Sequence, residues 1–425
     1  MTANSSPLPV ANLGNRRELL KSAAFLGLAT GAKMLLGNDE SHAEGMGMDS
    51  VIGKLRELRT IAAVREAGPS LKDTVTIGVD LNSLETNYWK RVAIRNTYFL
   101  GCTFDSPETE HLVQGKGAVV IPRFQGLSYN PYRTALYTPE ELMKEVSGGQ
   151  TLDQSIYADF MEKGKFPPNV MEAVTRGIHD DSIDDALGLV IEQTGPKNIV
   201  GVMGGSSNKR NDRWYRPTAQ AARLLTRSGY LVMTGGGPGM MEAANLGAYF
   251  ANGEDGLLDR AISILGEALD YEDKDHKPIP AYNERALAAR SLASGKGARN
   301  LGVPTWFYGH EPTNVFATDV AKYFANSRRE AGMIQIAVGG VVFAPGSAGT
   351  RQEVFMDAAQ NHYASTGFRS AMVFLGREPD GSIPPVFPLL QHVEKNLKDF
   401  LLTTDEPNDV VSFIKSHPPM PPTSG

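Results

Sequence analysis

The chain has 425 residues, of which 41% are hydrophobic and 21% charged, with a formal net charge of −6 and one cysteine. This length is enough for two or three domains with well-buried cores, and the acidic balance argues against a general nucleic-acid binder. A single cysteine excludes an intrachain disulfide and a cysteine-based zinc site, and the eight histidines follow no metal-binding spacing. No apolar run reaches the length of about 18 residues that indicates a transmembrane helix. We therefore expect no metal, no other cofactor and no membrane span.

We interpret the first 48 residues as a leader outside the fold. Arg16 and Arg17 precede a short, weakly apolar stretch over residues 22–31, and Ser41-His42-Ala43 offers a cleavage site with small residues. This pattern predicts export by the twin-arginine route and a periplasmic location. The alternative is a mobile, partly helical leader on a cytoplasmic protein, because Lys33 interrupts the apolar region.

Residues 49–195 are predicted to form an additional α+β region whose role the sequence does not indicate. Helical patterns cover residues 51–66, 154–163 and 169–179, and strand-like runs cover residues 75–78 and 118–122. The acidic cluster over residues 180–185 resembles a metal site. The first turn of a helix capped by Asp181 or Ser182 explains that cluster better.

From residue 198 onward, strand-like and helical patterns alternate. Strands are predicted at residues 198–203, 230–234, 301–306, 338–343 and 371–375. This alternation predicts an α/β fold, a doubly wound parallel Rossmann-like sheet over residues 196–410. An insertion over residues 251–300 is expected to be helical, and residues 411–425 are expected to form a disordered tail.

Three glycine-rich turns each follow a predicted strand and open a predicted helix. They are Gly204-Gly205-Ser206-Ser207, Gly235-Gly236-Gly237-Pro238-Gly239 and Gly346-Ser347-Ala348-Gly349-Thr350. Such turns leave backbone N–H groups at the positive end of a helix, where a phosphate can bind. A tight turn also needs glycine for steric reasons alone, but three turns at one edge of a sheet favour a nucleotide pocket. We take as nucleotide-binding candidates Gly204, Gly205, Ser206, Gly236, Gly237, Gly239, Gly346, Ser347, Gly349 and Thr350.

These turns do not follow the common nucleotide fingerprints. The GxGxxG dinucleotide motif and the GxxxxGK[ST] P-loop are both absent from the sequence. Hydride transfer and nucleoside triphosphate hydrolysis are therefore disfavoured.

Two of the turns resemble motifs of the LOG (lonely guy) family. Gly235-Gly-Gly-Pro-Gly-Met-Met-Glu-Ala-Ala244 and Pro345-Gly-Ser-Ala-Gly-Thr-Arg-Gln-Glu353 are similar to its paired GGGxxGLM and PGGxGTxxE motifs, and Arg328-Arg329-Glu330-Ala-Gly-Met333 is similar to its RKxxM segment. The resemblance covers roughly residues 195–405, about half the chain. It implies a Rossmann-like phosphoribohydrolase in which Glu353 is the catalytic glutamate and Arg329 the catalytic arginine. Ser347 replaces the second glycine of PGG, and Glu330 replaces the lysine of RKxxM.

Each of these side chains also has a structural explanation. Thr350-Arg-Gln-Glu353 matches a capping box, which would make Glu353 part of a helix cap. Arg329 would be a surface arginine in a charged run, and Glu242 is either structural or ribose-binding. Tyr308 to Glu311 either line the same crevice or serve a turn.

The resemblance implies hydrolysis of the N-glycosidic bond of a nucleoside 5′-monophosphate, giving a free base and ribose 5-phosphate. The expected substrate is AMP, a related purine or a cytokinin-type nucleotide, and no residue is assigned as general acid. In size the chain looks nearer to the larger bacterial nucleotide 5′-monophosphate nucleosidases. We expect a homo-oligomer, a dimer or higher. The alternatives are a non-catalytic nucleotide sensor and a pyridoxal-phosphate decarboxylase, for which no local motif supplies a convincing lysine.

Overall fold

The structure, a computed structural model, describes residues 55–146, 148–275, 277–309, 311–377, 382–393 and 395–421. The predicted leader lies outside these residues, and its export signal stays a prediction. Among the described residues, no helix is long and apolar enough to cross a membrane. The chain divides into two units, one ending at Phe124 and the other beginning at Gln125.

The first unit is a small parallel sheet with a helix after each of its first three strands. In chain order it contains β1 (Arg56–Leu58), α2 (Ile61–Glu66), β2 (Thr74–Ile77), α3 (Thr86–Arg91), β3 (Thr97–Leu100), α4 (Pro107–Gly115) and β4 (Val119–Ile121). The strands lie in the order β1-β2-β3-β4. Its core surrounds Trp89, whose ring meets the Phe99 ring edge-on at 5.7 Å.

The helix expected over residues 51–66 is confirmed for residues 61–66 and is wrong for the described residues before them. Residues 56–58 form β1, and α2 begins only at Ile61. Thr60 caps α2, because its side chain accepts a hydrogen bond from the Ala63 N–H at 3.1 Å. The helical pattern therefore starts where a cap is available, and the preceding residues pair with β2.

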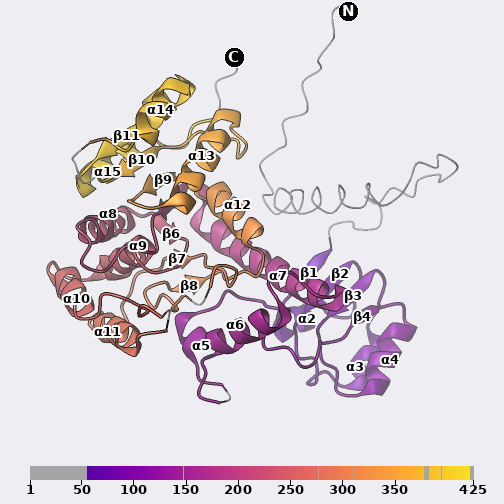
Figure 1. Cartoon of the computed structure of the whole chain (residues 1–425). Helices are drawn as coiled ribbons and strands as arrows, with labels where there is room; N and C mark the ends of the chain where they lie inside the picture. Colours follow the sequence, from indigo (N-terminus) through magenta and orange to yellow (C-terminus); the bar gives the residue numbers. More distant parts are fainter. Residues whose placement is uncertain are drawn as a thin grey trace, which may run out of the picture. The chain divides into compact units, whose positions relative to one another are not determined.

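The second unit contains a seven-stranded sheet that confirms the doubly wound prediction. Its strands are β5 (Ile199–Met203), β6 (Leu231–Thr234), β7 (Leu301–Gly302), β8 (Asp319–Val320), β9 (Gly340–Phe343), β10 (Met372–Leu375) and β11 (Leu401–Thr404). They lie parallel in the order β11-β10-β9-β5-β6-β7-β8 (Figure 1). Strands β6, β7 and β8 follow β5 on one side of the sheet, whereas β9, β10 and β11 follow on the other side. The strand order therefore reverses between β5 and β9, and sheets of this type bind ligands at that position.

Eleven α-helices of this unit are described, together with three short 3₁₀ segments. They are α5 (Pro139–Met143), α6 (Leu152–Lys163), α7 (Val170–Thr194), α8 (Tyr215–Arg227), α9 (Met240–Tyr249), α10 (Leu257–Leu265), α11 (Pro280–Ser291), α12 (Asn326–Ile336), α13 (Ala348–Tyr363), α14 (Val386–Val393) and α15 (Pro407–Ser416), with η2 (Pro196–Asn198), η3 (Phe250–Asn252) and η4 (Lys395–Phe400). The insertion is helical as expected, because α10 and α11 lie within residues 251–300.

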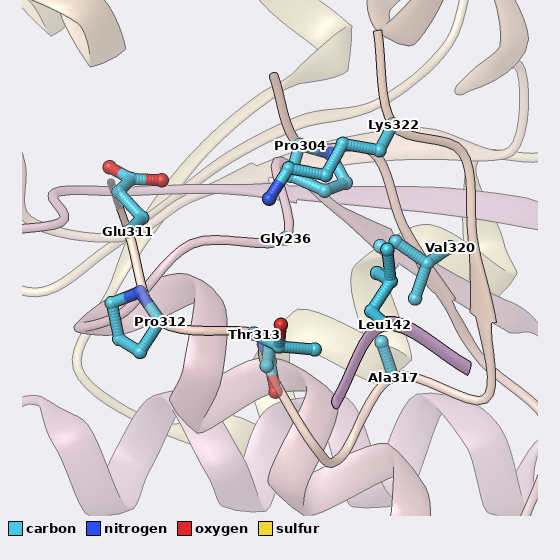
Figure 2. A pocket seen from close by; sticks show the side chains of 11 residues that line it. Leu142, Gly236, Pro304, Glu311, Pro312, Thr313, Ala317, Val320 and Lys322 are labelled. Carbon is cyan, nitrogen blue, oxygen red and sulfur yellow. The ribbon is translucent and has the colours of Figure 1, made fainter. Parts of the chain in front are cut away.

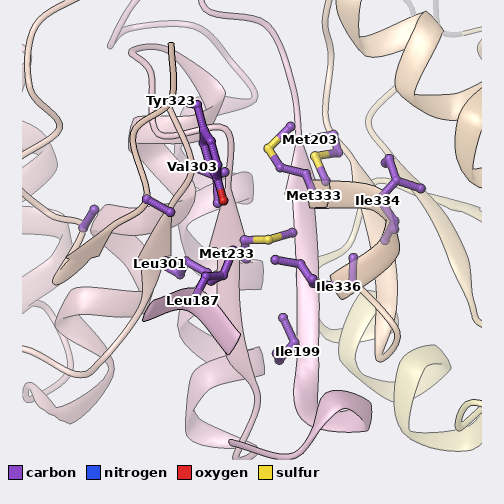
Figure 3. Close-up of a cluster of buried hydrophobic side chains, with 14 of the residues drawn as sticks. Leu187, Ile199, Met203, Met233, Leu301, Val303, Tyr323, Met333, Ile334 and Ile336 are labelled. Atoms are coloured by element: carbon purple, nitrogen blue, oxygen red, sulfur yellow. The ribbon is translucent and has the colours of Figure 1, made fainter. Parts of the chain in front are cut away.

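Helices cover both faces of the sheet, since successive strand residues point to opposite sides. Ile199 and Met203 of β5 pack in the core formed with α7, α12, α13 and α14 (Figure 3). Val200 and Val202 pack in a second core with α8, α9 and α15. The result is a three-layer arrangement that leaves the carboxyl ends of the strands as the edge where the three glycine turns lie.

Two sequence-based expectations are wrong, one for the acidic cluster over residues 180–185 and one for the C-terminal tail. Residues 180–185 lie in the middle of the 25-residue helix α7, so Asp181 and Ser182 cap no helix there. Residues 411–416 are not a disordered tail but part of α15, whose Val410, Val411 and Ile414 are buried against the sheet. The apolar spacing of those side chains makes one face of a helix, and burying it stabilises the segment.

Candidate functional site

The first glycine turn, after β5, is hydrogen-bonded to the segments of the other two turns, at the position where the strand order of the sheet reverses. The Gly205 N–H donates to the Pro345 carbonyl at 3.0 Å, and the Met240 N–H donates to the Gly205 carbonyl at 3.0 Å. Gly239 has a φ of 70°, and a side chain there would clash with the Gly205 carbonyl. The structure therefore brings the three predicted turns into direct contact, as parallel strands require.

The third turn is an open helix N-terminus. Residues 346–349 are exposed, and Ser347 precedes α13 without forming a side-chain cap. A side chain at Gly346 would clash with Thr350, whereas the space around Gly349 is empty to 4 Å. The N–H groups of the first turn of α13 are thus available to an anion at the positive end of a 16-residue helix. Ser347 fits in place of glycine because its φ is −100°.

The second turn, in contrast, is closed. Residues 235–239 are buried, and a side chain on Gly236 would meet the Pro304 ring at 2.7 Å. A side chain on Gly237 would come within 2.8 Å of Glu311 Oε2. For Gly236 and Gly237 the structure supports the steric explanation, because their missing side chains make room for the loop after β7.

Arg329 is buried beside the second turn, so it is not a surface arginine. It is 8% exposed on α12, where its Nε donates to Asn326 Oδ1 at 3.0 Å. Its Nη1 lies 3.3 Å from the position of a Cβ on Gly235. A buried guanidinium aimed at the ends of the strands can hold an anionic ligand group.

Glu353 is a half-buried carboxylate without a partner. The described residues offer its side chain no hydrogen bond or ion pair, and burial raises its pKa to about 7 although nearby Arg329 lowers it. The capping-box explanation is wrong, because α13 begins at Ala348 and Thr350 already lies within its first turn. Glu353 projects from the next turn, so its charge is free for a role other than capping.

Glu311 is the functional candidate that the sequence did not single out. Burial raises the pKa of its carboxyl group, and Lys322 and Arg329 lower it. Glu311, Lys322 and Gly236 line a small cavity, in which Figure 2 shows the Lys322 side chain directed toward the Gly236 turn. From the sequence we could say only that Tyr308 to Glu311 line the crevice or form a turn. Residues distant in the chain bury Glu311, and no pattern of neighbouring residues predicts such burial.

Glu330, which replaces the lysine of the RKxxM pattern, links three elements around Arg329. Its carboxylate accepts hydrogen bonds from the Tyr308 hydroxyl at 2.7 Å and from Gln352 Nε2 at 3.1 Å. Arg329 Nη2 lies 3.4 Å from the same carboxylate. Glu330 thus joins α12, α13 and the loop after β7 in one polar network.

Asp180 fixes the beginning of α12 from the middle of α7. Its carboxylate accepts hydrogen bonds from the Phe324 N–H at 3.0 Å and the Ala325 N–H at 2.8 Å. His179 is fully buried beside it, and burial lowers the pKa of the imidazole. One member of the acidic cluster of α7 therefore anchors the two residues that precede α12.

Glu242 belongs to a closed network away from the open turn. Arg210 binds its carboxylate with two hydrogen bonds of 2.6 and 2.9 Å. The hydroxyls of Tyr215 and Tyr282 donate to the same carboxylate at 2.8 and 3.0 Å. With its oxygens occupied and only 3% exposure, Glu242 is structural and not ribose-binding.

Comparisons with known proteins identify part of this unit. Residues 197–258 match the SLOG cluster4 family. The matched SLOG domain runs from β5 into α10 and contains the first two glycine turns, and Arg329 and Glu353 lie after it. The match to a SLOG domain suggests a small-molecule ligand.

The other comparisons add little to the SLOG match. A search of the curated proteins finds no match. Among solved structures, the chain is similar to the molybdenum cofactor binding protein from the phototrophic bacterium Rippkaea orientalis, with 15% identity and a TM-score of 0.32. The similarity covers 51% of this chain and 95% of that one.

Proposed function

We propose that the second unit binds a nucleoside 5′-monophosphate and hydrolyses its N-glycosidic bond. The observation that carries the proposal is the carboxylate of Glu353, which the described residues leave unpaired. It lies one turn beyond an open helix N-terminus and close to the buried guanidinium of Arg329. A phosphate on the α13 amides would place the attached sugar within reach of that turn. Phosphate binding alone requires the amides but not the carboxylate.

In the proposed reaction the bond between the sugar C1′ and the base nitrogen breaks as a water oxygen bonds to C1′. Ionised Glu353 stabilises the positive charge that develops on the sugar and takes the proton of the attacking water. Arg329 orients the phosphate or ribose and keeps part of Glu353 ionised near neutral pH. We assign to Glu311 the proton that the departing base receives, since its raised pKa keeps more of it protonated than an exposed glutamate.

The test is the release of ribose 5-phosphate from AMP by the wild-type chain and by Glu353→Gln. The substitution keeps the size of the side chain and removes its charge, so we expect a loss of at least about 100-fold in kcat. Glu254→Gln, at an exposed position in the same unit, is the matched control and should keep full activity.

Two outcomes would contradict the proposal. Undiminished hydrolysis by Glu353→Gln would remove Glu353 from the mechanism. Binding of AMP by the wild-type chain without any turnover would favour the nucleotide sensor, the alternative from a different class of protein.

A further inference from the structure

A second and larger cavity opens on the other side of the third glycine turn. Its volume is about 470 Å³, within the range of small-molecule sites. The turn after β5, the turn after β9, the end of β10 and the start of α14 contribute to its walls. It therefore lies at the same edge of the sheet as the proposed catalytic site.

The cavity and the proposed catalytic residues lie on opposite faces of α13. Thr350, Arg351 and Val354 line the cavity, whereas Glu353 is close to Arg329 and Gln352 contacts Glu330, both on α12. Successive residues of an α-helix are about 100° apart, so the centres of these two groups of side chains lie roughly 160° apart around the helix axis. The two sites therefore share only the N-terminus of α13, and one compact ligand body cannot occupy both.

The cavity combines an aromatic floor with a positively charged rim. Phe343 and Phe374 both line it, with ring centroids 5.2 Å apart and planes at 28°. Arg213 and Arg351 are exposed at its edge, and the described residues offer Arg351 no ion pair. The amides of α13 add a third source of positive potential.

Trp214 adds an unsatisfied donor to the same wall. Its Nε1 is buried without a hydrogen-bond partner among the described residues. Among the described residues that line the cavity, Asp212 has the only acidic side chain, and it already accepts hydrogen bonds from the backbone N–H of Trp214 at 2.8 Å and from Asn208 Nδ2 at 3.0 Å. The walls therefore favour a ligand that brings an acceptor and negative charge.

We propose that this cavity is a separate site for a planar aromatic anion, such as a purine nucleotide. The ring lies against Phe343 and Phe374, and the negative group lies between Arg213, Arg351 and the first turn of α13. Because the occupant uses the same amides as the substrate phosphate of the proposed reaction, the two ligands exclude each other. A ligand in this cavity therefore inhibits the proposed hydrolysis, and its binding does not require the carboxylate of Glu353.

The experiment titrates the full-length Glu353→Gln variant with AMP and, separately, with ribose 5-phosphate. Binding is followed by calorimetry and by tryptophan fluorescence. AMP should change the fluorescence and ribose 5-phosphate should not, because only AMP carries a ring to place beside Trp214. The signal should disappear in Trp214→Phe while the heat of AMP binding remains.

A charge test identifies the site independently. Arg213→Gln combined with Arg351→Gln should weaken AMP binding at least about tenfold, since two charge-assisted contacts are lost. Arg260→Gln, an exposed arginine on α10, is the control and should bind like the parent. Circular dichroism checks that the double variant is folded.

The possible results separate this inference from the proposed function. If the wild type releases no ribose 5-phosphate but the Trp214 signal and the arginine effect appear, the inference stands and the hydrolase proposal fails. AMP binding with no fluorescence change and with unchanged affinity in the double variant would overturn the inference, because the ligand would then lie on the Glu353 face. Absence of any AMP binding at millimolar concentration would also overturn it.

Discussion

The buried carboxylates beside Arg329 are held in an unusual electrostatic state. Desolvation raises the pKa values of Glu353 and Glu311, and the positive charge of Arg329 lowers both. The described residues offer neither carboxylate a salt bridge that would offset its loss of hydration. Their burial thus costs stability near neutral pH, as expected where side chains are placed for chemistry and not for folding.

This cost predicts a pH-dependent gain in stability for Glu353→Gln. The folded-state pKa of about 7 lies above the ordinary value of 4.5, so the stability contributed by Glu353 is complete below pH 4.5 and is lost as the pH rises through 7. The glutamine variant does not titrate, and it should exceed the wild type by about 1–3 kcal/mol at pH values above 7. Urea unfolding at both ends of this pH range measures the difference. An equal difference at the two pH values would contradict the prediction.

At the scale of elements, α7 positions the helix that carries Arg329. Asp180 accepts the two N–H groups that precede α12, and Arg329 lies on the first turn of that helix. A carboxylate at a helix N-terminus also interacts favourably with the helix dipole. The long helix α7 is therefore part of the support of the proposed site.

We expect Asp180→Asn to destabilise the protein by about 1–3 kcal/mol, since an amide oxygen satisfies only one of the two N–H groups. AMP hydrolysis should fall together with stability, because Arg329 would lose its fixed position. The control is Asp181→Asn, at a neighbouring side chain that is 67% exposed. Unfolding in urea and ribose 5-phosphate release measure the two effects. Full activity in Asp180→Asn would show that α12 does not need these two hydrogen bonds.

A second prediction at the scale of elements concerns the packing of α8 against α9. A Cβ on Gly247 would clash with the Ala219 carbonyl, whereas a Cβ on Gly332 of α12 meets nothing within 4 Å. Gly247→Ala should therefore cost at least about 2 kcal/mol through forced separation of the helices. Gly332→Ala should instead stabilise the protein by about 0.5–1 kcal/mol, the intrinsic helix preference of alanine. Similar effects of the two substitutions in urea unfolding would contradict this reading.

At the scale of the whole molecule, the two units have separate hydrophobic cores, which predicts two unfolding transitions. Trp89 is buried in the core of the first unit and Trp306 in a core of the second. Phe99→Ala should lower the transition of the first unit by about 3–5 kcal/mol, because it removes the edge-on neighbour of Trp89. Differential scanning calorimetry should then show one transition shifted and the other unchanged. A single transition that moves as a whole would show that the units unfold together.

The sequence by itself determined the elements whose signals are local. The alternation of strands and helices, the three glycine turns and the helical insertion follow from patterns spanning a few residues, and the structure confirms the α/β fold. Arg329 and Glu353 were proposed as catalytic residues because their segments resemble motifs of the LOG family. The first turn of α13, with its exposed residues, also lies where the glycines predicted it.

Only the tertiary structure decided which of these side chains are free and which are engaged. The Glu242 carboxylate is occupied by Arg210, and Asp180 accepts a hydrogen bond from the N–H of Ala325, 145 residues further along the chain. Glu311 gained its buried position from residues distant in the chain, and Glu353 proved not to be a cap. Burial and pairing depend on what the fold brings near a side chain, and no pattern of neighbouring residues contains that information.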